Sequence, residues 1–477
     1  MTHSLLLKLS TIVILLFVAA RSIASGSFPI KIEQALTHYQ IDQNDVSLIV
    51  QAIDENEARL SLNPDALRNP ASLAKLITSW VALKRLGPSY KWKTEFYTAG
   101  EIKDGVLHGD LVIKGYGDPY LTNQDLWSIL GKLNRNGLKK ITGQLLLDDT
   151  YFITDEIDPY AFDGDGTHIY NNLPNALTLN FNALDLTFSA KNNNTKITAS
   201  YWPPIENIKL NNSVQLINGS CIGKMPNIKI DSITIENETH IKARGEMPLS
   251  CKDYSVSRNL MSRDRYFFNS FKMIWNQWGA QIDGNVGRTV LTKEHTLLYS
   301  HDSPALADVI TAMNKWSNNQ MARSLIYTLG VSPDGAHATR ARGIKVITEE
   351  LENYNIPKTA LTIINGSGLS RNVRASGNAI TQILRAAWND KNASEFVSSL
   401  SILGYDGTAA KRSLSGTSKT TMRVKTGSLD DVSAIAGYIH QGNKVFTVVC
   451  IVNSFIVNDG IGKKFEDEVL NWASSLR

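Results

Sequence analysis

Residues 69–76 read Asn-Pro-Ala-Ser-Leu-Ala-Lys-Leu, and this segment opens a helical pattern that runs from Leu73 to Leu86. The apolar residues of that pattern recur three and four positions apart, and Gly87-Pro88 ends it. Ser72 and Lys75 are three residues apart, so they share one face of the helix. A lysine whose pKa is lowered by burial can accept the proton of such a serine. Alternatively, Ser72 caps the helix and Lys75 is solvated, which is the usual reading of this pattern alone.

Two motifs far downstream favour the catalytic interpretation. Ser317-Asn318-Asn319 falls in a stretch predicted to be helical from Leu306 to Tyr327, and Lys425-Thr426-Gly427 ends an edge-like strand. Each triplet taken alone is typical of a polar turn. Three distant segments in this order are the parts of a serine acyl-transfer site that uses lysine as its base.

The residue types assign a role to each motif. Ser317 can relay protons and Asn319 can bind a substrate amide. Lys425 supplies a second cation that lowers the pKa of Lys75, and with Thr426 it can bind a carboxylate. Gly427 has no side chain, so an extended substrate can pair alongside the strand.

Two backbone N–H groups complete the expected site. Those of Ser72 and Ser428 are the natural pair for an oxyanion hole. We expect neither a metal nor another cofactor.

The N-terminus is expected to be a cleaved signal peptide, residues 1–24. An apolar run from Leu5 to Ala20 precedes Ser22-Ile23-Ala24, which has small residues at the spacing that signal peptidase prefers. The run is shorter than the ~20 residues that span a bilayer. We therefore expect a periplasmic or secreted chain without a stable membrane span, soluble or peripheral. A net charge of +4 without a long basic run argues against a nucleic-acid partner.

Three cysteines are informative in an exported chain, where disulfides form. Cys221 and Cys251 bracket one polar segment, whereas Cys450 lies in an apolar strand pattern. We expect a Cys221–Cys251 disulfide and a free, buried Cys450, with three unpaired thiols as the alternative.

The pattern of the chain predicts a discontinuous catalytic domain with a large insertion. Residues 25–89 and 289–477 carry the helices and the last three strands of an α/β layer. Residues 90–288 are rich in strand patterns and asparagine turns, and show no helix comparable to the flanking ones. We expect two units there, residues 184–254 and the remainder.

These features resemble the penicillin-recognising serine enzymes, in particular the low-molecular-mass class C penicillin-binding proteins. Besides the three motifs, the Gly115–Leu121 and Gly404–Thr408 segments are similar to loops of that family, and so is the long insertion. The resemblance implies a transpeptidase-like domain with an antiparallel sheet and flanking helices. It also implies an exported D-Ala-D-Ala carboxypeptidase and endopeptidase that acts on peptidoglycan peptides and is acylated by β-lactam antibiotics.

By that resemblance Ser72 is the acylated nucleophile and Lys75 its base. One departure lies in Asn365-Gly366-Ser367-Gly368-Leu369-Ser370-Arg371, because the family loop usually begins with aspartate. Asn365 keeps the size of that residue and loses its charge.

Two other functions share the motifs. A β-lactamase is usually far shorter, and no Glu-x-x-Leu-Asn segment follows Ser317 to activate a deacylating water. A non-catalytic sensor of β-lactams or cell wall would carry a broken motif or a transmembrane segment.

Asp165 is the first candidate for a substrate-binding residue of the insertion. It closes an acidic stretch that begins at Asp155 and is interleaved with aromatic residues. The resemblance places this stretch beside the catalytic cleft, where a carboxylate could bind the free amine of a stem peptide. A solvated acidic loop is the alternative.

Overall fold

The computed structural model describes residues 28–155, 158–190, 196–223, 225–412 and 422–476. The predicted signal peptide lies outside these ranges. Within them, no helix combines the length and the hydrophobicity that a bilayer crossing requires.

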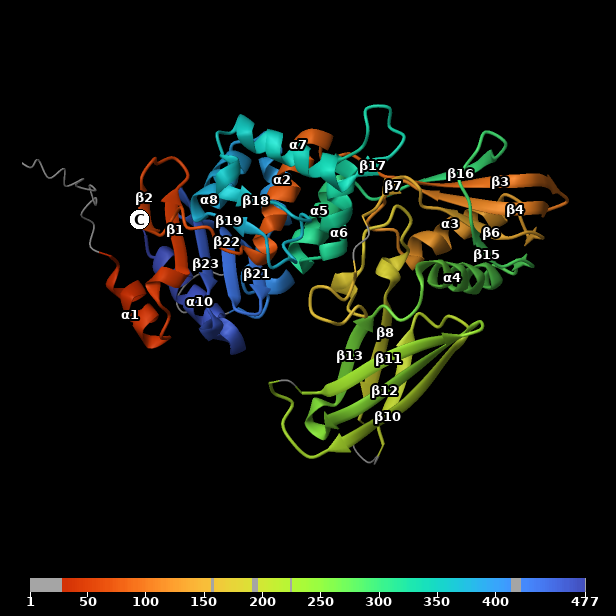
Figure 1. The fold of residues 1–477 in the computed structure, drawn as a ribbon, viewed down its shortest axis with the longest axis horizontal. Coiled ribbons are helices and arrows are strands. Elements are labelled where there is room, and N and C mark those ends of the chain that lie inside the picture. The colour runs from red at the N-terminus through yellow and green to blue at the C-terminus, as the bar shows by residue number, and fades with distance from the viewer. Residues whose placement is uncertain (1–27, 156–157, 191–195, 224, 413–421, 477) are drawn as a thin grey trace, which may run out of the picture.

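The two ends of the chain share one six-stranded antiparallel sheet, with the strand order β2-β1-β23-β22-β21-β20 (Figure 1). The N-terminal strand β1 pairs with the C-terminal strand β23 along its whole length. Strands β1 and β22 are buried over nearly all their residues because helices cover both faces of the sheet. The bounds are β1 Val46–Ala52, β2 Ala58–Leu62, β20 Ser401–Ile402, β21 Met422–Leu429, β22 Val432–Gln441 and β23 Lys444–Asn453.

Side chains that alternate along β22 enter two separate cores. Ala434 and Ala436 pack with the helices of one face, whereas Ile435 and Ile439 pack under α1 (Ile30–His38) and α10 (Ile461–Ala473) on the other. The helices on the first side are α2 Ala74–Leu86, α5 Leu306–Trp316, α6 Asn319–Leu329, α7 Arg340–Asn353, α8 Gly377–Trp388 and α9 Ala393–Ser399. The short pair β18 Leu361–Thr362 and β19 Arg374–Ala375 also belongs to this part.

The helix predicted from Leu306 to Tyr327 is in fact two helices. Ser317 ends α5 in the left-handed conformation, with φ of 57°, and Asn318 caps α6 by accepting a hydrogen bond from the backbone of Met321. An asparagine side chain that accepts a hydrogen bond from the backbone N–H three residues ahead favours the start of a new helix, which explains the break. The break turns the Ser317 hydroxyl out of the helical repeat.

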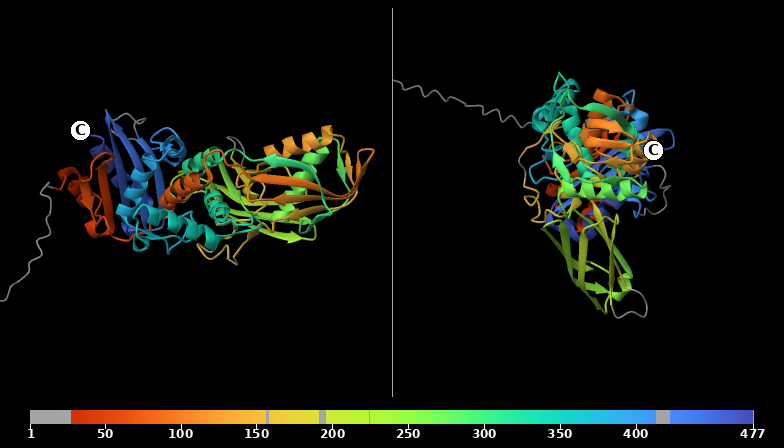
Figure 2. Two further views of the ribbon diagram at one scale, coloured as in Figure 1. Left: turned by 90° about the horizontal axis from the view of Figure 1, so that it is seen from above. Right: turned by 90° about the vertical axis from the view of Figure 1, so that its right-hand side faces the viewer.

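The insertion begins with a second sheet, seen at the far end of the molecule from β2 (Figures 1 and 2). Its path is β14-β5-β4-β3-β16, and β6 and β15 join it beside β4. The bounds are β3 Lys93–Lys103, β4 Val106–Gly115, β5 Lys140–Ile141, β6 Leu145–Asp148, β14 Gln281–Ile282, β15 Val286–Arg288 and β16 Thr296–Asp302.

Two long helices pack on this sheet, so the expectation of an insertion without long helices is wrong. They are α3 (Asn123–Arg135) and α4 (Arg263–Gln277). The buried face of α4 is largely aromatic, including Tyr266, Phe271 and Trp275. Aromatic residues favour strands by propensity, which hides the helical repeat.

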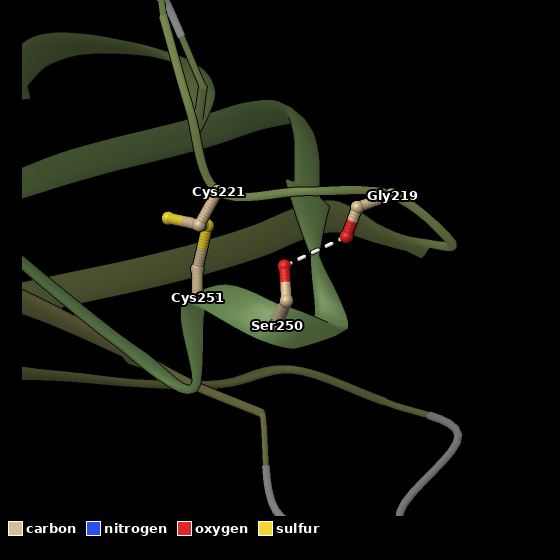
Figure 3. The surroundings of a disulfide bond; sticks show 4 residues. All are labelled: Gly219, Cys221, Ser250 and Cys251. Atoms are coloured by element: carbon tan, nitrogen blue, oxygen red, sulfur yellow. Dashed lines mark hydrogen bonds between the residues drawn. A yellow bond between two sulfur atoms is a disulfide. The ribbon is translucent and has the colours of Figure 1, made fainter.

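The second unit of the insertion contains two three-stranded sheets, β10-β12-β11 and β13-β8-β9. A disulfide joins Cys221 to Cys251 in this unit (Figure 3), and Cys450 is free and buried, as predicted. Ser250 donates a hydrogen bond to the carbonyl of Gly219 beside the bridge. The bounds are β8 Leu184–Ser189, β9 Thr198–Trp202, β10 Ile208–Ile217, β11 Asn227–Ile235, β12 Glu238–Pro248 and β13 Asp253–Arg258.

Two expected boundaries need correction. Strand β16 pairs with β3, so the insertion sheet extends past residue 288 to Asp302. Strand β13 pairs with β8 up to Arg258, four residues beyond the expected end of the second unit at 254. In both cases the closing strand is recognised only by its partner, which lies far away in the sequence.

A further short contact joins the insertion to the helical side of the catalytic domain. Strand β7 (Phe152–Ile153) pairs in parallel with β17 (Ala338–Thr339). The acidic segment that follows β7 therefore starts against the catalytic domain.

Candidate active site

Ser72 lies in a short 3-10 turn, Ala71–Leu73, that leads directly into α2. Asn69 holds this turn, because its Oδ1 accepts a hydrogen bond of 2.9 Å from the backbone of Ala71 and its Nδ2 donates to the carbonyl of Ser370 at 2.9 Å. Ala71 has φ of 46°, a left-handed conformation that costs energy for a residue with a side chain. The strained turn presents the Ser72 hydroxyl at the entry to the helix.

Lys75 is fully buried and its amine contacts three oxygen atoms. Nζ lies 2.6 Å from Oδ1 of Asn319, 2.6 Å from the carbonyl of Ser367 and 3.0 Å from Oγ of Ser72. The first two atoms can only accept hydrogen bonds. A neutral amine has two N–H groups, so both are used there and the lone pair is left for the Ser72 hydroxyl.

The surroundings favour this neutral form. Burial lowers the pKa of Lys75 well below its ordinary value, and the positive charges of Lys425 and Arg323 lower it further. A neutral amine hydrogen-bonded to a hydroxyl is the arrangement that a general base requires.

Lys425 and Ser317 form a second pair. Nζ of Lys425 donates to Oγ of Ser317 at 2.9 Å and to the carbonyl of Thr426 at 2.8 Å. Lys425 is also fully buried, which lowers its pKa to about 7. An amine with that pKa can lose and regain a proton near neutral pH, so this pair is suited to passing protons.

The strand β21 runs very close to the turn that carries Ser72. A Cβ atom placed on Gly427 would lie 2.9 Å from the carbonyl oxygen of Pro70 and 3.1 Å from the backbone nitrogen of Ser72. A Cβ on Gly368 would lie 1.8 Å from the carbonyl oxygen of Ala71. These two glycines therefore allow two other segments of the backbone to approach Ser72 closely.

One edge of β21 is free for pairing beside the site. Strand β20 pairs only with Arg423 and Val424, so within the described chain residues 425–429 of β21 have no strand partner on that side. The hydroxyl groups of Thr426 and Thr408 are 2.6 Å apart at this edge. An extended peptide can add there as a further strand.

These elements open into a cavity of about 740 Å³, the catalytic cavity. Ser72, Ser317, Asn319 and Ser428 line it, together with Trp316. The indole of Trp316 is 69% exposed, which is unusual for so large an apolar side chain.

Of the predicted residues, Ser72, Lys75 and Asn319 are joined by hydrogen bonds in one group, and Ser317 and Lys425 in a second. Thr426, Gly427 and Ser428 follow on β21. Asp165 is not among the residues that line the catalytic cavity, whereas Asp163 is.

The carboxylate of Asp165 is engaged locally. Its Oδ1 accepts hydrogen bonds from the backbone and the hydroxyl of Thr167, at 2.8 and 2.6 Å. Asp163 accepts from the hydroxyl of Tyr170 at 2.6 Å and from Nδ2 of Asn171 at 2.7 Å. The sequence could not separate these two carboxylates, because both lie in the same acidic turn.

Three further residues of the site were not predicted. The carbonyl of Ser367 completes the contacts of Lys75, Arg323 acts on Lys75 by charge, and Trp316 lines the cavity. Of these three, only Ser367 lies in a loop that resembles a family motif, the loop that begins at Asn365. Asn365 itself forms no ion pair, and its side chain binds the backbone of Ser367 and Leu369.

Comparisons with known proteins agree with this geometry. The D-Ala-D-Ala carboxypeptidase 3 (S13) family matches residues 29–476. The D-alanyl-D-alanine carboxypeptidase DacB of Haemophilus influenzae is 25% identical over 428 residues, which cover 89% of this chain and 88% of that protein. The D-alanyl-D-alanine carboxypeptidase of an Actinomadura strain is 24% identical over 407 residues, or 80% of this chain and 72% of that protein.

A solved structure shares the fold. The crystal structure of penicillin-binding protein 4 from H. influenzae has a TM-score of 0.78 and 23% identity, and the match covers 93% of this chain and 99% of that one. The same protein has been solved in complex with a β-lactam, with a TM-score of 0.74, 22% identity, and coverage of 94% of this chain and all of that one (100%).

Proposed function

The chain belongs to the D-Ala-D-Ala carboxypeptidase 3 (S13) family, and we propose that it hydrolyses the D-Ala-D-Ala ends of peptidoglycan stem peptides through an acyl-enzyme on Ser72. The observation that carries this proposal is the contact of 3.0 Å between Nζ of Lys75 and Oγ of Ser72, in a site that keeps the amine neutral.

The reaction begins when Oγ of Ser72 attacks the carbonyl carbon of the penultimate D-alanine. The proton of the hydroxyl passes to Lys75, and the backbone N–H groups of Ser72 and Ser428 stabilise the oxyanion. Ser317 delivers its proton to the nitrogen of the departing D-alanine and takes a proton from Lys425, to which it is bonded at 2.9 Å. Water then hydrolyses the ester on Ser72 and gives up a proton to Lys425, while Lys75 returns its proton to Oγ of Ser72.

Substrate binding uses the free edge of β21. The peptide pairs beside Thr426 and Gly427, and its terminal carboxylate is bound by the charge of Lys425 and the hydroxyl of Thr426. Asn319 binds a substrate amide with the side-chain nitrogen that Lys75 does not occupy.

The same site would accept two related substrates. A cross-link between stem peptides ends in the same D-alanine carbonyl, so we propose D,D-endopeptidase activity as well. A β-lactam would acylate Ser72 through its ring carbonyl, and the resulting ester would be hydrolysed slowly. Both reactions occur outside the cytoplasm, which agrees with the proposed signal peptide of residues 1–24 and a periplasmic or secreted location.

Intact-mass measurement with benzylpenicillin tests the nucleophile. We expect one covalent adduct on the wild-type protein and none on Ser72→Ala. Ser370→Ala serves as a matched control, because this serine lies in the neighbouring loop and only its hydroxyl is removed. An adduct that persists in Ser72→Ala would refute the assignment. Mass analysis of purified muropeptides after incubation then separates carboxypeptidase from endopeptidase products.

We also propose that the acidic turn at residues 163–165 binds the free amine of a stem peptide, with Asp165 as first choice. Asp165→Asn should then lower kcat/KM for amine-bearing peptides roughly tenfold, about 1.4 kcal/mol, and leave penicillin acylation unchanged. Asp163→Asn is the paired test, because that carboxylate lines the catalytic cavity. An equal decrease in kcat/KM for the peptide and in the rate of penicillin acylation would indicate a folding defect. If neither decreases, the turn is a solvated acidic loop without a role in binding.

A further inference from the structure

A second cavity of about 430 Å³ lies next to the catalytic cavity. Phe162 and Leu369 line both, so one wall separates them. Three arginines also line the second cavity, Arg323, Arg340 and Arg371, and we call it the arginine cavity.

Two of the three arginines are already neutralised. Nε of Arg340 lies 2.7 Å from a carboxylate oxygen of Asp155, and Arg371 lies 3.2 Å from Asp430. Arg323 differs, since no carboxylate of the described residues lies within ion-pairing distance of it. Its Nη1 donates to the backbone carbonyl of Asn172 at 3.0 Å.

One N–H donor of Arg323 is unsatisfied. Nε is buried and has no hydrogen-bond partner among the described residues. Burial lowers the pKa of Arg323 to about 10, which reflects how poorly its charge is compensated. A buried cation without a counter-ion is costly, and proteins normally pair such a group.

Among the described residues, the other walls of the cavity supply no counter-ion. Asn365 is neutral, and the carboxylate of Asp158 is exposed and caps the backbone of Tyr160 at 2.9 Å. Ile326, Leu369 and Pro174 make part of the lining apolar. The cavity thus combines an uncompensated guanidinium with an aliphatic wall.

We propose that the arginine cavity binds a carboxylate carried on a short aliphatic chain, with the Arg323 guanidinium as its counter-ion. The carboxylate accepts a hydrogen bond from the free N–H of Arg323, and the aliphatic chain of the ligand packs on the apolar wall. A carboxylate of the stem peptide and a free small carboxylic acid have the same chemistry. The first of these sources rests on the proposed function.

Binding of a carboxylate in the arginine cavity would change the pKa of Lys75, the proposed base. Arg323 lies on α6 four residues after Asn319, and its charge helps to lower the pKa of Lys75. A bound carboxylate offsets that charge, so the pKa of Lys75 rises. The acid limb of the acylation rate then moves to higher pH when the cavity is filled.

Calorimetric titration with propionate tests the proposal on the full protein without any substrate. We expect propionate to bind and propionamide, its neutral isostere, not to bind. Arg323→Gln should weaken propionate at least tenfold. Arg265→Gln removes one charge outside the cavity and should leave binding unchanged.

Three results would overturn the proposal. They are equal binding of propionate and propionamide, undiminished binding by Arg323→Gln, and an equal loss in Arg265→Gln. The comparison of propionate with propionamide needs only the wild-type protein, so equal binding of the two overturns the proposal even if Arg323→Gln does not fold. Because no turnover is measured, this failure is distinct from a failure of the proposed function.

A second measurement identifies the source of the carboxylate and provides the pH readout. If the ligand belongs to the substrate, amidation of a stem-peptide side carboxylate lowers kcat/KM in the wild type and not in Arg323→Gln. If amidation has no effect, the ligand is a free acid. In that case propionate should shift the acid limb of penicillin acylation to higher pH, and an unshifted profile would contradict the link to Lys75.

Discussion

Replacing Gly427 by alanine would push β21 away from the nucleophile. The new Cβ would lie 2.9 Å from the carbonyl oxygen of Pro70 and 3.1 Å from Cβ of Ala71 and the nitrogen of Ser72, whereas ordinary contacts begin at 3.4 Å. The separation must therefore grow by 0.3 to 0.5 Å (3.4 − 3.1 and 3.4 − 2.9). All three atoms belong to the turn that carries Ser72, and a flexible side chain is not available to move instead.

That displacement acts directly on the reacting groups. A misplacement of ~1 Å in an active site can cost about a hundredfold in rate, so half an ångström should cost roughly tenfold, about 1.4 kcal/mol. The rate of Ser72 acylation by benzylpenicillin, followed by intact mass, measures it. Because Ser72, Lys75 and Ser317 all remain, the adduct should still form at saturation.

Gly131→Ala is the matched control for this experiment. A Cβ at Gly131, in α3 of the insertion, would lie 2.5 Å from the ring of Trp278. It should lower the Tm and leave the acylation rate of the folded protein unchanged. Wild-type acylation by Gly427→Ala with an unaltered Tm would show that β21 does not control the position of Ser72, and the reasoning would be refuted.

Two further perturbations test other parts of the structure. In Lys425→Met the loss of a positive charge should raise the pKa of Lys75, so the acid limb of the acylation rate should move to higher pH. The difference from the wild type should be largest below pH 7, because Lys425 has a pKa of about 7 and carries its charge there. A pH profile identical to the wild type would leave Lys425 only as a carboxylate anchor. Replacing Cys221 and Cys251 by serine opens a loop of 30 residues and should lower the free energy of unfolding by roughly 3 kcal/mol in the chain-entropy treatment. Denaturant unfolding measures this loss, and an unchanged value would show that the bridge adds nothing to stability.

Local patterns in the sequence were sufficient for the main catalytic contacts. The spacing of Ser72 and Lys75 places both on one helical face, which depends only on neighbouring residues of the chain and needs no tertiary information. The Cys221–Cys251 bridge could likewise be inferred from an exported chain and a third cysteine in a buried strand.

Features that depend on distant partners were not predictable in this way. The carbonyl of Ser367 contacts Lys75 across 292 residues, and β16 is recognised only through its pairing with β3. Arg323 has the periodicity of an ordinary helical position. Its importance comes from what is missing around it, which only the packed structure reveals.

The pairing of β1 with β23 determines when this protein can become active during its synthesis. Val46 pairs with Val452, and until β23 exists β1 has only the short hairpin partner β2. A two-stranded hairpin is marginally stable in water. During most of translation, the turn that carries Ser72 therefore cannot pack against a completed sheet.

A nascent chain therefore carries its nucleophile from the start without being able to use it. Lys425 and the strands β22 and β23 are made long after Ser72, and contacts between segments far apart in the sequence form slowly. Acylation therefore requires that strands β21 to β23 have been made and have folded against the turn of Ser72.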